Sequence, residues 1–366
     1  MVASILDYLA WRGDILFSQL GLNEVDAMIL SELAYISYDG LVADSLQVSV
    51  PLRTVVKTIL ALPDPAARCH VEKDFELLQA IAESERFGTA GVTFYRNVLI
   101  PEEETQFAAI TFQLEDGTAF LAFRGTDYSL VGWKEDFNMA YQKSVPAQRL
   151  AQEYVQRYAA TSNLPLRLGG HSKGGNLAIY AGAKCGSLIQ ERILDVYNFD
   201  GPGFALEMLS NPGYMEIIPK IRTLVPQFSV IGMIMERSEK ERVVQSDASG
   251  LLQHDPYSWQ VMGKTFVGLE SVTDGSLFLD RTLTTWLDGL SMEERSAFID
   301  GIFDLLTQEN ASQAKDLLRP QNIIAVLKAI RMDEEKRRMM GTRLQELLET
   351  AKTMQLKPTI TKTESR

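Results

Sequence analysis

Short apolar runs alternate with amphipathic stretches through the middle of the chain, a pattern typical of strands and helices that follow one another. Two strands are predicted, at residues 107–114 and 118–123. They are joined across Glu115-Asp116-Gly117, where the Asp-Gly pair favours a tight hairpin turn. A helix with one apolar face is predicted next, from about Pro146 to Ala160.

Three further apolar runs predict buried strands, at residues 164–168, 193–199 and 221–225. A helical stretch that includes Gly175 to Ala181 separates the first two runs. Strands that alternate with helices imply parallel pairing, with helices on both faces of the sheet. We therefore expect an α/β fold with a mostly parallel sheet.

The two ends of the chain differ from this middle part. The first hundred residues mix helical and irregular signals, with a helix start at Asn23. From about Phe278 the pattern becomes helical, and Ser291-Met292-Glu293-Glu294 forms a capping box. We predict a main domain at residues 1–277, which includes an N-terminal helical segment, and a C-terminal helical region at residues 278–366.

Composition limits the classes of partner and compartment. The 366 residues are 46% hydrophobic and carry a net charge of −12, which argues against nucleic-acid binding because phosphates need a concentrated basic surface. The first residues lack the basic start of a secretory signal, and the apolar stretches are too short for a membrane span. Two cysteines do not make a disulfide framework. We expect a cytoplasmic protein, and homo-oligomerisation and peripheral membrane contact stay open.

Candidate chemistry is concentrated at Gly170-His171-Ser172-Lys173-Gly174, which lies between a predicted strand and a predicted helix. Glycines two positions before and after a serine leave room for a strained turn that exposes its hydroxyl as a nucleophile. The N-terminus of the following helix favours the negative charge that develops on an acyl oxygen. Ser172 is therefore the predicted nucleophile.

The base has few candidates, because the chain has three histidines. His171 is adjacent to the serine in a turn that directs neighbouring side chains apart. His70 lies upstream of the predicted sheet, whereas the order expected for this turn is serine, then acid, then histidine. His254 lies in a loop after the last predicted strands, so it is the predicted base.

Three carboxylates compete for the acid. Asp200 ends the strand at residues 193–199, so its side chain is expected at the same sheet edge as Ser172. There it would fix the tautomer of the histidine. Asp247 and Asp255 stay open as alternatives, although both are near enough to His254 in sequence to shape its loop instead.

The oxyanion hole of such a site takes one N–H from the residue after the nucleophile, here Lys173, and one from a loop after an earlier strand. Residues 123–127 occupy that loop, and Thr126 is the residue expected to supply the second N–H. The side chain of Lys173 is expected either to admit an anionic substrate or to reach solvent. This chemistry requires neither a metal nor a cofactor.

The combination of these motifs resembles class-three, fungal-type lipases. The matching segments are Ala122-Phe123-Arg124-Gly125-Thr126, the Trp-x-x-Asp segment at 133–136, and the serine turn at 170–175. The resemblance covers roughly residues 100–265, and the whole chain resembles a bacterial branch of this group. It implies an α/β-hydrolase fold and a serine hydrolase that acts on carboxylic esters.

The chain departs from that family at the acid. Class-three lipases carry the triad aspartate after the strand that here ends near Val225, and this chain has Ser229 there. Pancreatic-type lipases instead place the acid after the strand that here ends at Asp200, which favours Asp200.

Two functions from different classes follow from the sequence. The first is an esterase or lipase that cleaves a small-molecule ester or a lipid through Ser172, Asp200 and His254. The second is a hydrolase-like protein without activity that binds a lipid or another protein, because fold alone does not determine function. A complete serine, acid and histidine order favours the enzyme.

Overall fold

The computed structural model describes residues 3–126 and 144–291 and, beyond them, residues 294, 342, 345–346 and 349–353. The chain divides into two compact units, Met1–Val272 and Thr273–Arg366, and each is described by itself. The division expected between residues 277 and 278 stays a prediction. No helix in the described part of the chain is long and apolar enough to cross a membrane.

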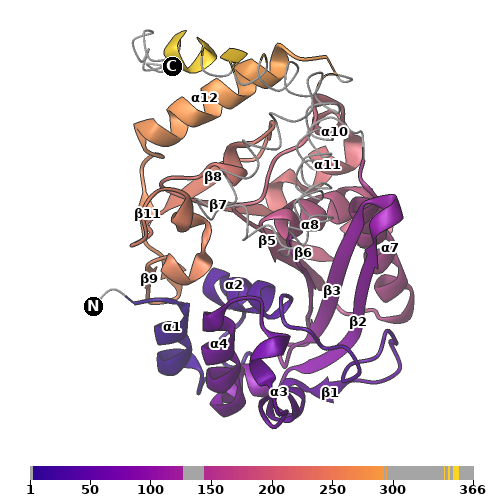
Figure 1. Ribbon diagram of the computed structural model, residues 1–366. Coiled ribbons are helices and arrows are strands. Elements are labelled where there is room, and N and C mark those ends of the chain that lie inside the picture. Colours follow the sequence, from indigo (N-terminus) through magenta and orange to yellow (C-terminus); the bar gives the residue numbers. More distant parts are fainter. Residues whose placement is uncertain are drawn as a thin grey trace. The chain divides into compact units, whose positions relative to one another are not determined.

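A nine-stranded sheet forms the centre of the first unit, in the order β1-β2-β3-β4-β5-β6-β7-β8-β11 (Figure 1). β4 to β8 pair in parallel, and the strands at both edges pair antiparallel. The strands are β1 (Val50–Pro51), β2 (Gly91–Ile100), β3 (Thr105–Gln113), β4 (Ala119–Phe123), β5 (Leu166–His171), β6 (Ile193–Phe199), β7 (Ile221–Pro226), β8 (Glu241–Val244) and β11 (Gly268–Leu269). β9 (Val261–Met262) and β10 (Thr265–Phe266) form a separate antiparallel pair. The predicted α/β fold is confirmed, and its parallel pairing is confined to the five central strands.

Helices cover both faces of the sheet, as the alternation along β4 illustrates. Phe120 and Ala122 belong to a hydrophobic core that they share with α2 (Glu24–Leu33). Leu121 and Phe123 belong to a second core, with α7 and α8. Successive side chains of a strand point to opposite faces, so one strand contributes to two cores. The helices of the second core are α7 (Pro146–Thr161), α8 (Lys173–Lys184), α10 (Leu206–Leu209) and α11 (Pro212–Ile217).

The N-terminal segment forms the helical layer of the first core. Its helices are α1 (Ile5–Arg12), α2, α3 (Leu52–Leu60), α4 (Glu72–Glu83) and α5 (Glu85–Gly88). The helix start predicted at Asn23 is confirmed: the N–H groups of Val25 and Asp26 donate to the Asn23 side chain, which caps the first turn. α2 is buried along almost its whole length because it lies against β4 and β5.

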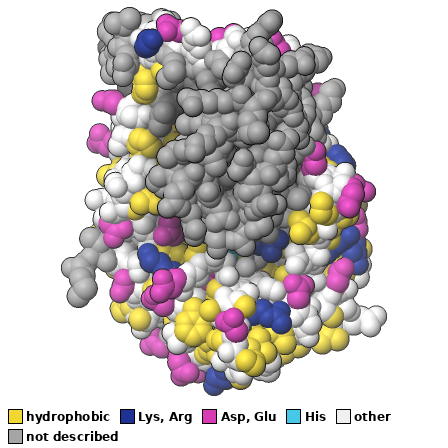
Figure 2. Space-filling view, viewed as in Figure 1, with side chains coloured by type: hydrophobic (Ala, Val, Ile, Leu, Met, Phe, Trp, Pro, Cys, Tyr) yellow, Lys and Arg dark blue, Asp and Glu magenta, His cyan; other side chains and the backbone are white. Residues whose placement is uncertain are grey.

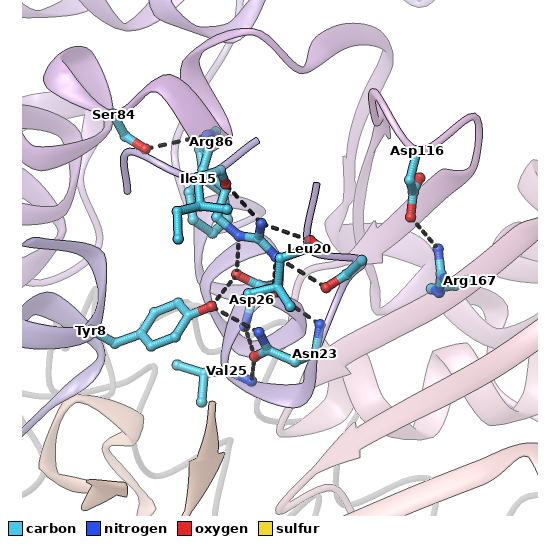
Figure 3. Close-up of polar contacts among 12 residues, drawn as sticks. Tyr8, Ile15, Leu20, Asn23, Val25, Asp26, Ser84, Arg86, Asp116 and Arg167 are labelled. Atoms are coloured by element: carbon cyan, nitrogen blue, oxygen red, sulfur yellow. Dashed lines mark hydrogen bonds and ion pairs between the residues drawn. The ribbon is translucent and has the colours of Figure 1, made fainter. Parts of the chain in front are cut away.

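A buried ion pair ties this layer together (Figure 3). The Arg86 guanidinium donates to both carboxylate oxygens of Asp26, at 2.8 and 2.6 Å, and to three backbone carbonyls in the loop 15–21. The Tyr8 hydroxyl donates to the same carboxylate at 2.9 Å. Each buried charge therefore has several partners, as burial requires.

Most strands and helices of the middle part form where the hydrophobic pattern predicts them. The hairpin turns at Gly117, whose φ of +79° is in the region that glycine adopts readily. The sequence pattern did not indicate β2. A register shift between Thr93 and Arg96 and a left-handed Phe94 (φ +54°) form a bulge, which interrupts the two-residue alternation of β2.

In the second unit, α12 spans Asp274–Asp288. The capping box predicted at Ser291 is present, since the Ser291 N–H donates to Glu294 Oε2 and the Glu294 N–H donates to Ser291 Oγ. Most of the predicted C-terminal helical region lies outside the described residues.

On the described part of the face in Figure 2, acidic side chains are interspersed with lysines and arginines.

Candidate active site

Ser172 lies in a tight turn between β5 and α8, at the C-terminal edge of the parallel strands. Its φ of +56° and ψ of −134° are strained values for a residue with a side chain. The flanking glycines are required by space. A Cβ on Gly170 would lie 2.3 Å from the Gly174 carbonyl carbon, and one on Gly174 would lie 2.1 Å from the Phe123 oxygen. The backbone of the predicted nucleophile turn is therefore present.

Asp200 follows β6 directly and lies at the same edge of the sheet. The Ser172 N–H donates to the carbonyl of Phe199 at 2.9 Å, which holds the two strand ends side by side. The Asp200 side chain is completely buried, and its backbone is left-handed, with φ of +51°. An aspartate tolerates that conformation better than most residues.

His254 contacts this buried carboxylate. Its Nδ1 lies 2.7 Å from Asp200 Oδ2, and the His254 side chain is 31% exposed. Because an ionised carboxylate only accepts, the proton of a neutral imidazole is on Nδ1, and Nε2 has its lone pair available to take a proton. Within residues 3–126 and 144–291, no hydrogen bond joins Ser172 to His254. Such contacts commonly form only when substrate binds.

Within the residues that the structure describes, neither of the other two acids has a hydrogen bond to His254. Asp255 accepts from the Tyr257 N–H at 3.0 Å, which fits the loop-shaping role considered for it. The Asp247 N–H donates to the Ser258 carbonyl at 3.0 Å. Of the three carboxylates considered, Asp200 is the one that the structure brings to the imidazole of His254.

Ser229, which stands where class-three lipases have their acid, contacts Asp200. Its hydroxyl donates to Asp200 Oδ1 at 2.5 Å. The backbone of Gly232 also lies close to this oxygen, because a Cβ on Gly232 would be 2.2 Å from it. One carboxylate oxygen is thus held by Ser229, and the other is left for His254.

The loop that follows β4 approaches the serine. A Cβ on Gly125 would lie 3.1 Å from Ser172 Cβ and 2.6 Å from the His171 oxygen, so only a glycine fits there. Thr126 is the next residue, and Lys173 begins α8 immediately after the serine. The structure therefore brings the backbone segments of both expected oxyanion donors to Ser172.

The expectation for the Lys173 side chain was wrong. Lys173 is buried, and its Nζ donates to the backbone oxygen and to Oε1 of Gln106 in β3, at 3.1 and 3.0 Å. It therefore neither reaches solvent nor faces a substrate. Pairing with a sheet oxygen decides its direction, and sequence spacing gives no signal of it.

Sequence reasoning also missed a contact of His171. Its Nε2 lies 2.9 Å from the backbone oxygen of His254. The signal that could have found it is the scarcity of histidine, since a buried polar side chain next to the nucleophile requires a partner. The Trp-x-x-Asp segment and Asp127 lie outside the described residues. In the described part of the chain, no group of three or more histidine, cysteine or acidic side chains could hold a metal ion.

A central parallel sheet with a strained serine turn between a strand and a helix defines this chain as a protein of the α/β-hydrolase fold. The family model described as Mbeg1-like matches residues 81–304, which is more than half of the chain. The chain belongs to the Mbeg1-like family.

Two lipases are among the solved structures that the chain is similar to. One is the Rhizomucor miehei lipase propeptide complex, with 13% identity, a TM-score of 0.31, and coverage of 54% of this chain and 64% of that one. The other is M37 lipase, with 12% identity, a TM-score of 0.34, and coverage of 57% and 69%. The chain thus spans less than two thirds of the first structure's length. No curated protein sequence matches the chain.

Proposed function

We propose that this protein is a serine hydrolase that cleaves carboxylic esters, of lipid or other acyl compounds, with Ser172 as nucleophile, His254 as base and Asp200 as acid. The observation that carries the proposal is the 2.7 Å contact between Asp200 and His254, beside the strained turn of Ser172. A carboxylate buried at a sheet edge, with an imidazole on one oxygen and a hydroxyl on the other, has the arrangement that orients a general base.

The reaction would proceed in two steps, acylation and deacylation of Ser172. His254 Nε2 takes the Ser172 proton while Oγ attacks the acyl carbon, and the N–H groups of Thr126 and Lys173 stabilise the oxyanion. The tetrahedral intermediate collapses, the imidazolium gives its proton to the leaving alcohol, and an acyl-serine forms. A water molecule then attacks with the same help from His254, which releases the carboxylic acid and restores Ser172.

The class of substrate is proposed from the site and from the resemblance of its motifs to those of lipases. No cofactor takes part in the proposed chemistry. We place the catalytic residues in the domain at residues 1–277 and the protein in the cytoplasm, which agrees with Cys69 and Cys185 being free thiols.

Labelling with a fluorophosphonate probe tests the assignment. The parent protein is expected to react, Ser172→Ala is not, and the turnover of a short p-nitrophenyl ester falls about 10³-fold or more in Ser172→Ala and in His254→Ala. Ser187→Ala is the matched control, because Ser187 is exposed and lies beyond the other end of α8. Equal labelling of the parent and Ser172→Ala, or of neither, would favour the binding protein without activity.

A further inference from the structure

All three histidines of the chain come together beside the candidate active site, although they are far apart in sequence. The rings of His70 and Tyr35 have centroids 5.2 Å apart, those of Tyr35 and His171 6.0 Å, and those of His171 and His254 4.6 Å. The proposed chemistry uses only His254. The buried His171 therefore needs an explanation.

The contact of His171 with His254 identifies its tautomer. His171 Nε2 lies 2.9 Å from the backbone oxygen of His254. A carbonyl oxygen only accepts, so the proton of the neutral imidazole must be on Nε2, and Nδ1 has the lone pair. This is the opposite tautomer from the one that Asp200 selects in His254.

The other side of the His171 ring faces the N-terminal layer. Nδ1 lies 3.3 Å from the Tyr35 hydroxyl and 3.4 Å from Glu32 Oε1. Burial lowers the pKa of His171 well below its ordinary value and raises the pKa of Glu32 well above its own, so burial favours the neutral form of each group. The Tyr35 hydroxyl lies at the same distance, 3.3 Å, from Nδ1 and from the His171 backbone oxygen, and both are acceptors when the ring proton is on Nε2.

The loop around His254 has little regular structure of its own. It consists of two short 3₁₀ turns, Gly250–His254 and Pro256–Ser258, whose hydrogen bonds have poor geometry. Side chains from outside the loop hold it instead. The hydroxyl of Tyr257 donates to Asp74 in α4 at 2.7 Å, and the ring Nε2–H of His171 donates to the His254 carbonyl.

We propose that His171 is a positioning residue that holds the main chain of His254 in place while Asp200 holds its side chain, and that the Tyr35 hydroxyl beside Nδ1 supports the tautomer of His171 which makes this hydrogen bond. The inference rests on the proposed function, because it assigns His171 a role toward the proposed base. Glu32 and Tyr35, which contact the His171 ring, belong to the N-terminal layer and lie outside the matched span of 81–304. In this proposal the N-terminal layer therefore contributes to the geometry of the site.

Nitrogen NMR of the histidine side chains tests the hydrogen bond directly in the intact protein. With three histidines, single His→Gln variants assign every signal. We expect His171 to be neutral, with its proton on Nε2, across pH 6–8, and His254 to carry its proton on Nδ1 when neutral. A proton on His171 Nδ1, or a His171 that gains charge in this range, would overturn the inference.

Kinetics test the positioning role. Replacing His171 by leucine removes the donor, and kcat per probe-reactive site is expected to fall roughly 10- to 100-fold with KM little changed, because small displacements of a catalytic group have effects of this size. His171→Gln keeps an N–H at a similar reach and is expected to recover most of the loss. His70→Gln is the matched control, since it removes the ring of the same cluster that lies beside Tyr35, at a position 184 residues before His254 in the chain.

Normalisation to probe-reactive sites corrects for protein that fails to fold. A parental kcat in His171→Leu, or a His171→Gln variant as slow as His171→Leu, would overturn the positioning role. A parent protein with no esterase activity and no probe labelling would overturn the proposed function and this inference with it. An active parent with His171 in the other tautomer would overturn this inference alone.

Discussion

Two acid–base pairs in the first unit differ in what they leave free. Asp26 and Arg86 are both completely buried, and their polar atoms bond to each other, to backbone carbonyls and to the Tyr8 hydroxyl (Figure 3). Asp200 is equally buried, but His254 is 31% exposed, and no partner for its Nε2 is found among the described residues. The polar atoms of the first pair are all bonded, whereas in the second pair Nε2 of His254 has no partner within residues 3–126 and 144–291.

The difference shows how burial separates a structural role from a chemical one. A buried pair with every donor satisfied contributes little net stability, but it is very costly to break. A buried acid that holds an exposed imidazole instead fixes the direction of a group that must gain and lose a proton. We therefore expect the first pair to control stability and the second to control rate.

The largest effect is expected from Asp200→Asn. Asparagine has the shape of aspartate and tolerates the left-handed backbone, so the melting temperature should change little. Its amide no longer selects the Nδ1–H tautomer of His254, so kcat should fall about 10⁴-fold. Ester turnover and thermal unfolding measure the two quantities. Asp247→Asn and Asp255→Asn are the controls, and a larger loss of kcat in either would show that another carboxylate serves His254.

The next effect concerns stability. Arg86→Met leaves the Asp26 carboxylate buried without its partner, so the free energy of unfolding should fall by about 3–5 kcal/mol, while kcat of the folded fraction stays near the parental value. Urea unfolding and active-site labelling are the measurements. Arg53→Met, which breaks the partly exposed pair with Glu85, should cost about 0–1 kcal/mol. Equal losses in both variants would contradict the view of a fully bonded pair.

A third prediction uses the buried carboxyl of Glu32, whose pKa is raised well above its ordinary value by burial. Because its pKa is raised in the folded protein, the folded state retains a proton that the unfolded chain loses above the ordinary value of 4.5. The parent should therefore lose stability as pH rises above 4.5, by up to about 1.4 kcal/mol per pH unit, until the folded pKa is reached.

Glu32→Gln cannot titrate and should lack this decline, so its stability relative to the parent should increase with pH. Urea unfolding at several pH values between 4.5 and 7.5 measures the difference. Glu153→Gln, at an exposed carboxylate paired with Arg96, is the control. Parallel curves for the parent and Glu32→Gln would mean that Glu32 is ionised in the folded protein.

The smallest effect is expected at Ser229. Ser229→Ala removes the hydroxyl that donates to Asp200 Oδ1, and one such hydrogen bond is worth about 0.5–1.5 kcal/mol, so kcat should fall by roughly 2- to 13-fold. Ester turnover compared with Ser210→Ala, at an exposed serine, provides the measurement. A loss as large as that of Asp200→Asn would show that the acid depends on Ser229 for its orientation.

Local sequence predicted the parts of the fold that depend on neighbouring residues. The strands at 193–199 and 221–225, the hairpin at Gly117 and the turn at Ser172 follow from short apolar runs and from glycines with defined roles. β2 was missed because its bulge at Phe94 interrupts the alternation that identifies a strand.

The candidate site divides in the same way. The residue types and their order indicated Ser172 and His254, and left Asp200, Asp247 and Asp255 open as acids. Which carboxylate meets the imidazole depends on where β6 ends beside β5, which is a property of the assembled sheet.

The sequence by itself determined the strand, turn and helix around Ser172, because that geometry is set within a few residues by glycines and by apolar periodicity. Only the tertiary structure decided that Lys173 is directed to Gln106, that Ser229 holds Asp200, and that His171 reaches His254. The physical reason is that a buried polar group must find a partner, and each of these partners is at least 29 residues away along the chain.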